Sequence, residues 1–353
     1  MRLDDLLAHK AEWLKGIGPN SEIIISSRIR LARNLAHQPF SHRAKKPGQD
    51  EVLQTMTEAL AQCHPLKGAL FLKLEALDEV DKQFLIERHL MSRDHALGAN
   101  HKGLAVGEGE VISIMINEED HLRMQALQSG FNLRQAWQIL DALDDELGTK
   151  VEYAYSTEWG YLTACPTNTG TGLRASVMAH LPALVMTKQI NKVLQAIAKL
   201  GLTARGFYGE GTEAIGNFFQ ISNQVALGHA EEELIENLER IIKQVIEHEQ
   251  NARDAMSRQD RMRLSDRIGR AFGTLQSAYI ISSNETVDLL SSVRLGVDMG
   301  IVKDLDRAAV NELFILIQPA HLQKLEGKKL SSAERDVKRA TLIRSKLIGD
   351  SHS

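Results

Sequence analysis

Four short segments of this chain gather arginine, carboxylate and thiol side chains in a pattern suited to holding and moving phosphate. In chain order they are residues 26–30 (SSRIR), 117–123 (NEEDHLR), 165–174 (CPTNTGTGLR) and 205–213 (RGFYGEGTE). A guanidinium group is planar, stays charged and presents parallel N–H donors that match phosphate oxygens. One such segment alone would be typical of a charged surface turn. All four together predict a site that clamps a polyphosphate with arginines.

The same segments carry carboxylates, which indicate the kind of atom that would receive a phosphoryl group. A guanidinium is a poor nucleophile because its pKa lies above about 12 and its lone pairs are delocalised. Two carboxylates can hold such a group through parallel hydrogen bonds and take its proton as the bond to phosphorus forms. The candidates in these segments are Glu118, Glu119, Asp120, Glu210 and Glu213.

Other nucleotide-binding motifs are absent from the sequence. It contains no GxxxxGK(S/T) loop and no HRD and DFG set, so a P-loop and the usual protein-kinase site are excluded. A nucleotide would therefore be held mainly by arginines. Glycines in the third and fourth segments could let backbone amides approach its phosphates. These are Gly170, Gly172, Gly209 and Gly211.

The four segments, in this order, resemble those of the phosphagen (guanidino) kinase family over about residues 22–230. The resemblance implies an α+β catalytic core in which helices flank a largely antiparallel sheet. It also implies transfer of phosphate from ATP to a guanidinium. Mg²⁺ is expected with the ATP, held by phosphates and water, so no protein ligand to the metal is named.

The resemblance assigns roles to individual residues. It implies that Glu210 is the catalytic base with Glu119 as its partner, and that Cys165 orients the substrate or senses oxidation. His89 matches a nucleotide-contacting histidine only in part, because its segment reads ERHL where the family has DDHF. The implied nucleotide-binding set is Ser26, Ser27, Arg28, Arg30, His89, Arg123, Arg174, Ala175, Ser176, Val177, Met178, Arg205, Gly206, Phe207, Tyr208 and Gly209.

Two differences from the phosphagen kinases indicate which branch of the family this chain resembles. Only about 20 residues precede the first segment, where the family has a small helical domain, and about 100 residues with helical spacing follow instead. This arrangement is similar to the bacterial protein-arginine kinases, whose tail carries an RDxxRA motif that binds phosphoarginine. Here the motif reads RDVKRA from Arg335, so Arg335, Asp336 and Arg339 are the implied regulatory site. One face of a helix would hold all three.

The elements that must position these residues can be predicted from hydrophobic spacing. Strands are expected at 23–25, 69–74 and 218–222, a hairpin at 103–117 and a loop at 163–174. Helices are expected at 3–15, 49–63, 78–91, 133–147 and 175–200. A helical apolar stripe from 234 to 246 is followed by helices at about 260–280, 284–295, 303–318 and 331–348.

Composition sets wider limits. The 353 residues, 43% of them hydrophobic, can form two domains, which we place at 1–255 (catalytic) and 256–353 (all-α, regulatory). The net charge of −4 predicts no general attraction to nucleic acid. The two cysteines, Cys63 and Cys165, lie far apart, which favours a reducing cytoplasm over a disulfide framework or zinc site. No signal peptide and no membrane span are expected.

The sequence thus predicts an ATP-dependent kinase that phosphorylates arginine residues exposed on proteins. The resemblance further implies an activator protein of the McsA type, Clp protease machinery in a stress response, and a homodimer or higher oligomer. Two alternatives stay open. One is a kinase of free arginine or another small guanidine, and the other is a non-catalytic adaptor that reads phosphoarginine through the tail.

Overall fold

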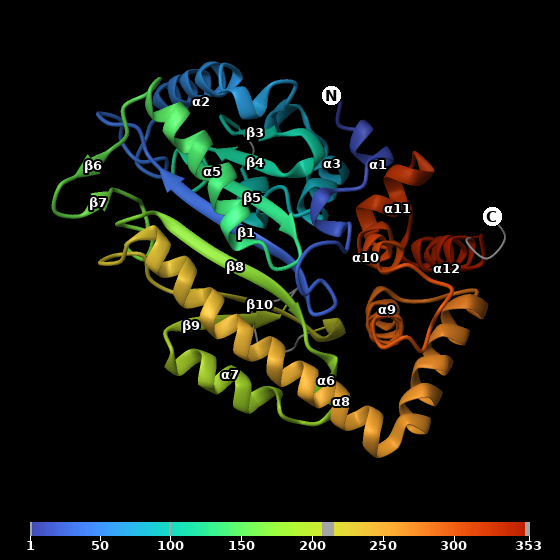
Figure 1. The fold of residues 1–353 in the computed structure, drawn as a ribbon. Helices are drawn as coiled ribbons and strands as arrows, with labels where there is room; N and C mark the ends of the chain where they lie inside the picture. The colour runs from blue at the N-terminus through green and yellow to red at the C-terminus, as the bar shows by residue number, and fades with distance from the viewer. Residues whose placement is uncertain (1, 99, 207–214, 350–353) are drawn as a thin grey trace.

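An eight-stranded antiparallel sheet forms the centre of the fold in the computed structural model, which describes residues 2–98, 100–206 and 215–349 (Figure 1). Its strand order is β2-β3-β4-β5-β1-β8-β10-β9, and β6 and β7 form a separate two-stranded sheet. The strands are β1 (Ile24–Arg33), β2 (Leu70–Lys73), β3 (Gly103–Val106), β4 (Ile112–Ile116), β5 (Leu122–Ser129), β6 (Tyr155–Ser156), β7 (Gly160–Tyr161), β8 (Leu173–His180), β9 (Leu202–Gly206) and β10 (Phe218–Asn223).

Helices flank this sheet and gather at one end of it. Those before the last strand are α1 (Asp5–Ala8), α2 (Lys46–Ala61), α3 (Glu79–Glu87), α4 (Arg93–Ala96), α5 (Leu133–Gly148), α6 (Pro182–Met186) and α7 (Ile190–Lys199). The later ones are α8 (Glu231–Ser277), α9 (Ser283–Asp298), α10 (Arg307–Leu316), α11 (Pro319–Glu326) and α12 (Ser332–Gly349). Figure 1 shows α9 to α12 together at one end, with the β6–β7 hairpin at the other.

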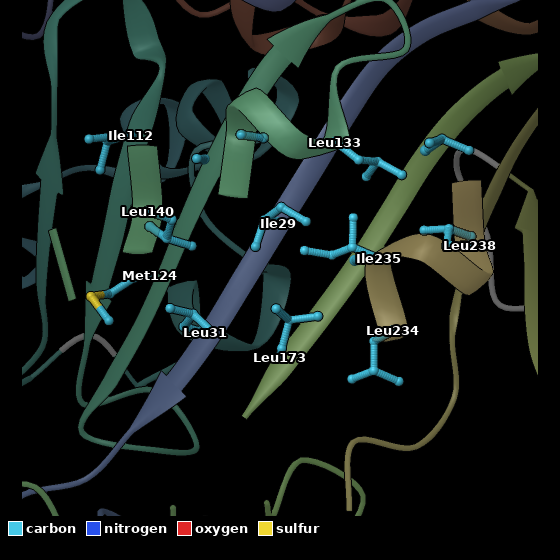
Figure 2. Close-up of a cluster of buried hydrophobic side chains, with 14 of the residues drawn as sticks. Ile29, Leu31, Ile112, Met124, Leu133, Leu140, Leu173, Leu234, Ile235 and Leu238 are labelled. Carbon is cyan, nitrogen blue, oxygen red and sulfur yellow. The ribbon is translucent and has the colours of Figure 1, made fainter. Parts of the chain in front are cut away.

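The main core lies between one face of the sheet and helices α5 and α8. Figure 2 shows Ile29 and Leu31 of β1 in one buried cluster with Leu140 of α5 and Leu238 of α8. Each such side chain contributes about 1.5–3 kcal/mol when buried. Alternate residues of a strand point to opposite faces of the sheet. Because Ile29 and Leu31 point into the core, their neighbours in the strand must point to the other face. Arg28 and Arg30 are therefore fixed on the opposite side of β1.

That opposite face is covered at its two ends and left open in the middle. Phe84 of α3 packs with Leu104 and Met115 over the β2–β4 end. Trp13, which lies in a short 3-10 helix (η1, Glu12–Leu14), packs with Phe314 of α10 at the other end. The middle of the sheet, where β1, β5, β8 and β10 run, is where a functional site can form.

Buried ion pairs join the helical tail to the chain around β1. Asp298 of α9 lies 3.0 Å from Arg294 and 2.6 Å from Arg307. Arg294 also donates to the carbonyl oxygen of Ser21 at 2.7 Å, just before β1. Because removal of one partner would leave a buried charge, the tail is held firmly against the sheet domain.

The predicted helix over 175–200 is wrong. Residues 173–180 form β8, and two short helices, α6 and α7, follow it. Pairing with β1 on one side and β10 on the other overrides the helix propensity of this alanine-rich stretch. Pro182 then begins α6, and Lys188, with a left-handed φ of 58°, separates α6 from α7.

The predicted helix over 3–15 is also wrong: only α1 and the 3-10 turn form there. The chain between them is extended at His9 and Ala11, which carries Trp13 into the junction with the tail. The 103–117 hairpin is confirmed by the pairing of β3 with β4, although α11 was not expected. Helix α8 continues past the expected boundary region to Ser277, with a break at Asp260 (φ −154°, ψ 62°).

No helix in the described ranges combines the length and apolar character needed to cross a lipid bilayer.

Candidate active site

All five arginines of the sequence segments lie on the open face of the sheet. β1 carries Arg28 and Arg30, and the register places Arg30 directly opposite Arg174 of β8. On the other side of β1, Ala32 lies opposite Arg123 of β5. Arg205 sits further along the sheet, on β9. The arginines come from segments that are distant in sequence, and they lie together because all four strands carry them on the same face of the sheet.

The positive charges of the arginines repel one another, so binding of an anion would stabilise the cluster. Burial and the charges of Arg123 and Arg174 lower the pKa of Arg28 to about 10. Burial, then Arg28, Arg123 and Arg174, lower the pKa of Arg30 as well. The Nε of Arg30 is buried and has no hydrogen-bond partner among the described residues. A polyphosphate would relieve both the repulsion and the unsatisfied donor.

One carboxylate, Glu118, is already committed to this cluster. Its Oε2 lies 2.6 Å from Nη1 of Arg123, and its other oxygen accepts a hydrogen bond from the Ser92 hydroxyl. Burial alone would raise the pKa of Glu118, but Arg123 and the Ser92 hydroxyl lower it below its usual range. Conversely, burial lowers the pKa of Arg123 while Glu118 raises it, and the net shift is upward. Glu118 therefore stays ionised and orients Arg123.

A cleft of about 600 Å³ lies over the arginines and is large enough for a nucleotide. Its floor includes Arg28, Arg30, Arg123 and Arg205. Its walls come from the end of α3, the start of α9 and the α10–α11 junction. Wall and floor residues that sequence reasoning missed are Gln125, Gln220, Ser283, Asn284, Gln318 and Pro319.

A smaller hollow of about 60 Å³ adjoins the cleft near the N-terminal end of β1. Its lining includes six members of the predicted nucleotide-binding set: Ser26, Arg28, His89, Ser176, Val177 and Met178. His89, which lines both spaces, follows α3 with a left-handed φ of 61°. Burial and the charge of Arg28 lower the pKa of His89 to about 3, so the imidazole is neutral at physiological pH.

Three members of that set do not present their side chains on the open face. Ala175 and Val177 of β8 belong to the main hydrophobic core on the far face of the sheet. The Ser27 hydroxyl donates to the carbonyl oxygen of Gly130 at 2.9 Å and accepts from the backbone N–H of Asn132 at 2.9 Å. Their alternation with Arg28, Arg174 and Ser176 is what keeps the arginines on the open face.

The C-terminal end of β1 brings the second and third segments together. The Asp120 carboxylate accepts a hydrogen bond from Asn34 at 2.7 Å and another from the N–H of Ala164 at 2.7 Å. This joins the turn that carries Glu119 to the loop that carries Cys165. Asp120, an alternative for the acid–base role, is thus occupied by structural contacts.

Glu119 and Cys165 differ in their surroundings. Glu119 is exposed, and burial of its inner part together with the charge of Asp120 raises the pKa of its carboxyl. The Cys165 sulfur lies 3.0 Å from the Thr167 hydroxyl. Burial, Arg205 and Arg123 lower the pKa of Arg174, while Cys165 acts on it in the opposite direction. Cys165 and Arg174 are therefore electrostatic neighbours, as their common segment suggests.

Several predicted residues lie outside the described part of the chain. They are Phe207, Tyr208, Gly209, Glu210, Gly211 and Glu213. Gly206, which precedes them, lines the cleft. The assignment of Glu210 as catalytic base stays a prediction.

The tail motif lies on α12, and its residues serve the fold in the described conformation. Arg339 is only 2% exposed; it donates to the carbonyl oxygens of Ile281 and Ile317 at 2.9 and 3.0 Å. It also lies 2.5 Å from the Asp336 carboxylate. Arg335 is half-buried and donates to the carbonyl oxygen of Leu330. The motif's assignment to phosphoarginine stays a prediction.

The missed residues differ in how far the sequence could have revealed them. Gln125 lies two positions after Arg123, and Gln220 lies within a predicted strand, so strict alternation would have placed both on the site face. Trp13, Ser283 and Gln318 reach the site only through the packing of distant segments. No local signal marks them.

Comparison with known proteins agrees with this geometry. Residues 51–252 match the family described as ATP:guanido phosphotransferase, C-terminal catalytic domain. Residues 261–352 match the Protein-arginine kinase McsB C-terminal domain. The two matches meet near the break in α8 at Asp260.

Relatives and solved structures point the same way. The protein-arginine kinase of Halothermothrix orenii is 51% identical over 348 residues, 98% of this chain and 99% of that protein. That of Bacillus subtilis (strain 168) is 44% identical over 340 residues, 96% of this chain and 93% of that protein.

Among solved structures, lombricine kinase is 28% identical with a TM-score of 0.58; the match covers 65% of this chain and 66% of that one. The duplicated taurocyamine kinase from Schistosoma mansoni with bound transition state analog components is 27% identical with a TM-score of 0.61, over 67% of this chain and 34% of that one. The arginine-lined sheet, the two family matches and the near full-length relatives lead to one conclusion: this chain belongs to the protein-arginine kinases, a branch of the ATP:guanido phosphotransferases.

Proposed function

We propose that this protein transfers the γ-phosphoryl group of ATP to arginine side chains of other proteins on the open face of its sheet. The observation that carries the proposal is the arginine cluster on the floor of the cleft, whose members lower one another's pKa values. Among the described residues, the buried Nε of Arg30 has no hydrogen-bond partner. Phosphoryl transfer asks mainly for positioning and for neutralisation of charge on the transferring group. A cluster of this kind supplies both.

The proposed reaction runs along β1. The base and ribose lie at the Ser26 end, the phosphates lie over Arg28 and Arg30, and the acceptor enters at the far end near Glu119. A nitrogen lone pair of the acceptor guanidinium attacks the γ-phosphorus, and the bond from that phosphorus to the β–γ bridging oxygen breaks. The acceptor nitrogen loses a proton to a carboxylate, and ADP leaves with the bridging electrons.

Two carboxylates are proposed for the acceptor end. Glu119 is suited to grip a guanidinium because it is exposed and its raised pKa brings it closer to the range of a general base. Glu210 is retained as the proposed base by resemblance alone. Cys165 would orient the acceptor beside Arg174. An acceptor end that opens to solvent suits an arginine carried on a protein.

Mg²⁺ is proposed to accompany the nucleotide. Within the described residues, no three histidine, cysteine or carboxylate groups come together as a metal site. Glu118, which contacts the arginine cluster through Arg123, is already engaged in that ion pair. These surroundings fit an ion held mainly by the phosphates themselves, where it would neutralise charge on the β- and γ-oxygens.

The wider role is also a proposal. Resemblance to the protein-arginine kinases supports cytoplasmic marking of proteins for Clp-dependent degradation under stress, with an activator of the McsA type and a homodimer or higher oligomer. It also supports regulation by phosphoarginine at Arg335, Asp336 and Arg339. A ligand there changes activity only if it binds two states of the protein unequally.

The experiment that tests the proposal compares two acceptors. Purified enzyme is incubated with ATP and either an arginine-bearing protein or free arginine, and phosphoarginine and ADP are both quantified. A protein-arginine kinase forms phosphoarginine on the protein in step with ADP. A strong preference for free arginine would identify a small-guanidine kinase instead, and no ADP with either acceptor would favour an adaptor.

A further inference from the structure

The indole of Trp13 forms part of the wall of the small hollow beside the arginine cleft. Trp13 is 3% exposed and lines this hollow together with Ser26, Met178 and His89. Its ring meets the His89 imidazole edge to face, with centroids 5.3 Å apart. Trp13 lies well before residues 51–252, so it is supplied by a segment outside the matched catalytic domain.

The polar atom of this side chain is buried without a partner. Within the described residues, the Nε1 of Trp13 makes no hydrogen bond. A buried indole N–H normally finds an acceptor, and leaving one unmade costs about 1–3 kcal/mol. An indole donor without a partner, in the wall of a hollow that adjoins a ligand-sized cleft, indicates that an acceptor on the ligand completes it.

Trp13 is held in place from behind. Its neighbour Leu14 accepts a hydrogen bond through its carbonyl oxygen from Asn311 of α10, at 3.4 Å. Phe314, on the same helix, lies with Trp13 in one apolar cluster. The indole is thus fixed between the sheet and the tail, so it can act as a preformed wall.

The position of the hollow along β1 indicates which part of a nucleotide it receives. Ser26, Arg28 and Arg30 follow one another at every second residue on the same face of the strand. A strand advances about 6.6 Å over two residues. With the phosphates over Arg28 and Arg30, the Ser26 end therefore receives the nucleoside.

We propose that Trp13 positions the nucleoside of ATP: its ring walls the base end of the site, and its Nε1–H donates to a ring nitrogen of the base or an oxygen of the ribose. The inference rests on the proposed function, which places ATP on the arginine face. It adds a nucleotide-binding residue from the N-terminal segment. Because α10 of the tail holds that segment in place, the tail also contributes indirectly to nucleotide binding.

Tryptophan fluorescence tests the contact directly. The chain has three tryptophans, Trp13, Trp137 and Trp159. In a Trp137→Phe, Trp159→Phe variant all emission comes from Trp13. Saturating ADP should change that emission, whereas tripolyphosphate, which lacks a nucleoside, should change it far less. Equal emission with and without bound ADP would overturn the proposal.

Kinetics of Trp13→Phe provide the second readout. Loss of one hydrogen bond should raise the KM for ATP roughly three- to tenfold. The kcat, the KM for the protein acceptor and inhibition by tripolyphosphate should stay within about twofold of wild type, which a general loss of structure would not allow. Trp159→Phe, at an exposed position, is the matched control and should leave all four values unchanged.

Failure of this inference differs from failure of the proposed function. If Trp13→Phe has a wild-type KM while Arg30→Ala loses ATP affinity, the arginine site stands and Trp13 has no part in it. If Arg30→Ala also binds ATP normally, ATP does not lie on this face and both proposals fall. Should Trp13→Phe not fold, the fluorescence of the single-tryptophan variant still decides.

Discussion

Glu118 and Arg123 form a salt bridge of 2.6 Å beside the arginine cluster, and the Glu118 side chain is only 4% exposed. Its neighbour Glu119 is exposed and makes no such pair in the described structure. Adjacent carboxylates of one turn are thus divided between two tasks. In the proposed reaction, Glu118 orients the phosphate-binding Arg123, and Glu119 is left to bind the acceptor.

This division predicts different defects for the two glutamine variants. Glu119→Gln should lower kcat by about 10²- to 10⁴-fold, as loss of a positioned acid–base group does, with little change in the KM for ATP. Glu118→Gln should mainly raise the KM for ATP, because Arg123 loses its orienting partner. Steady-state kinetics with both substrates varied separate the two cases. If Glu118→Gln has the larger kcat defect and Glu119→Gln behaves as wild type, the roles are reversed.

The arginines should each contribute more than an ordinary surface charge. Arg174→Ala and Arg205→Ala should weaken ATP binding and turnover together, by more than the roughly 1 kcal/mol at most that an exposed ion pair is worth. Arg258→Ala, on the exposed surface of α8, is the control and should have no effect. Calorimetric titration with ATP gives the affinities. Wild-type binding by both variants would remove Arg174 and Arg205 from the site.

Stability should fall as the solution is acidified from neutrality. Burial, with the charges of Arg294 and Arg253, lowers the pKa of His180 well below its usual value, and burial lowers that of His95 to about 4. Below about pH 6.5 the unfolded chain binds protons that the folded chain does not. Each such histidine then removes up to about 1.4 kcal/mol of stability per pH unit.

Urea unfolding at pH 7.5, 6.5 and 5.5 measures this effect. His180→Gln should show a smaller loss between pH 6.5 and 5.5 than wild type, even if it is less stable throughout. The interpretation fails if the two proteins lose stability in parallel across that range.

The tail motif should separate into structural and regulatory positions. Arg339→Ala should destabilise the fold strongly, because the carbonyl oxygens of Ile281 and Ile317 would lose a buried partner at about 1–3 kcal/mol each. Arg335→Ala should cost about 1 kcal/mol or less. Arg335→Ala is therefore the variant in which to test the response to phosphoarginine. An unaltered response there, with normal folding, would contradict a regulatory role for Arg335.

The site was more predictable than the elements that carry it. The arginine segments could be found because the residue types and their order in the chain identify them, whether they lie on strands, helices or loops. Arg174 was expected in a loop before a long helix, yet it lies near the start of β8. Alanine, valine and methionine around it fit either structure, and only the neighbouring strands β1 and β10 decide between them.

The parts of the site that depend on long-range packing could not be predicted. Trp13 lines the small hollow and Gln318 lines the cleft because the N-terminal segment and the tail pack against the same end of the sheet. The division of roles between Glu118 and Glu119 depends on where Arg123 and Ser92 lie in space. Neither relationship leaves a periodic pattern in the sequence.

The most direct test of the account is mass spectrometry of an arginine-bearing protein incubated with ATP and either wild-type enzyme or Arg30→Ala. With the wild type, phosphate is expected on arginine side chains in step with the ADP formed. With Arg30→Ala, a large loss of both is expected at an ATP concentration near the wild-type KM. Phosphate on other residue types only, or equal arginine phosphorylation by both enzymes, would contradict it.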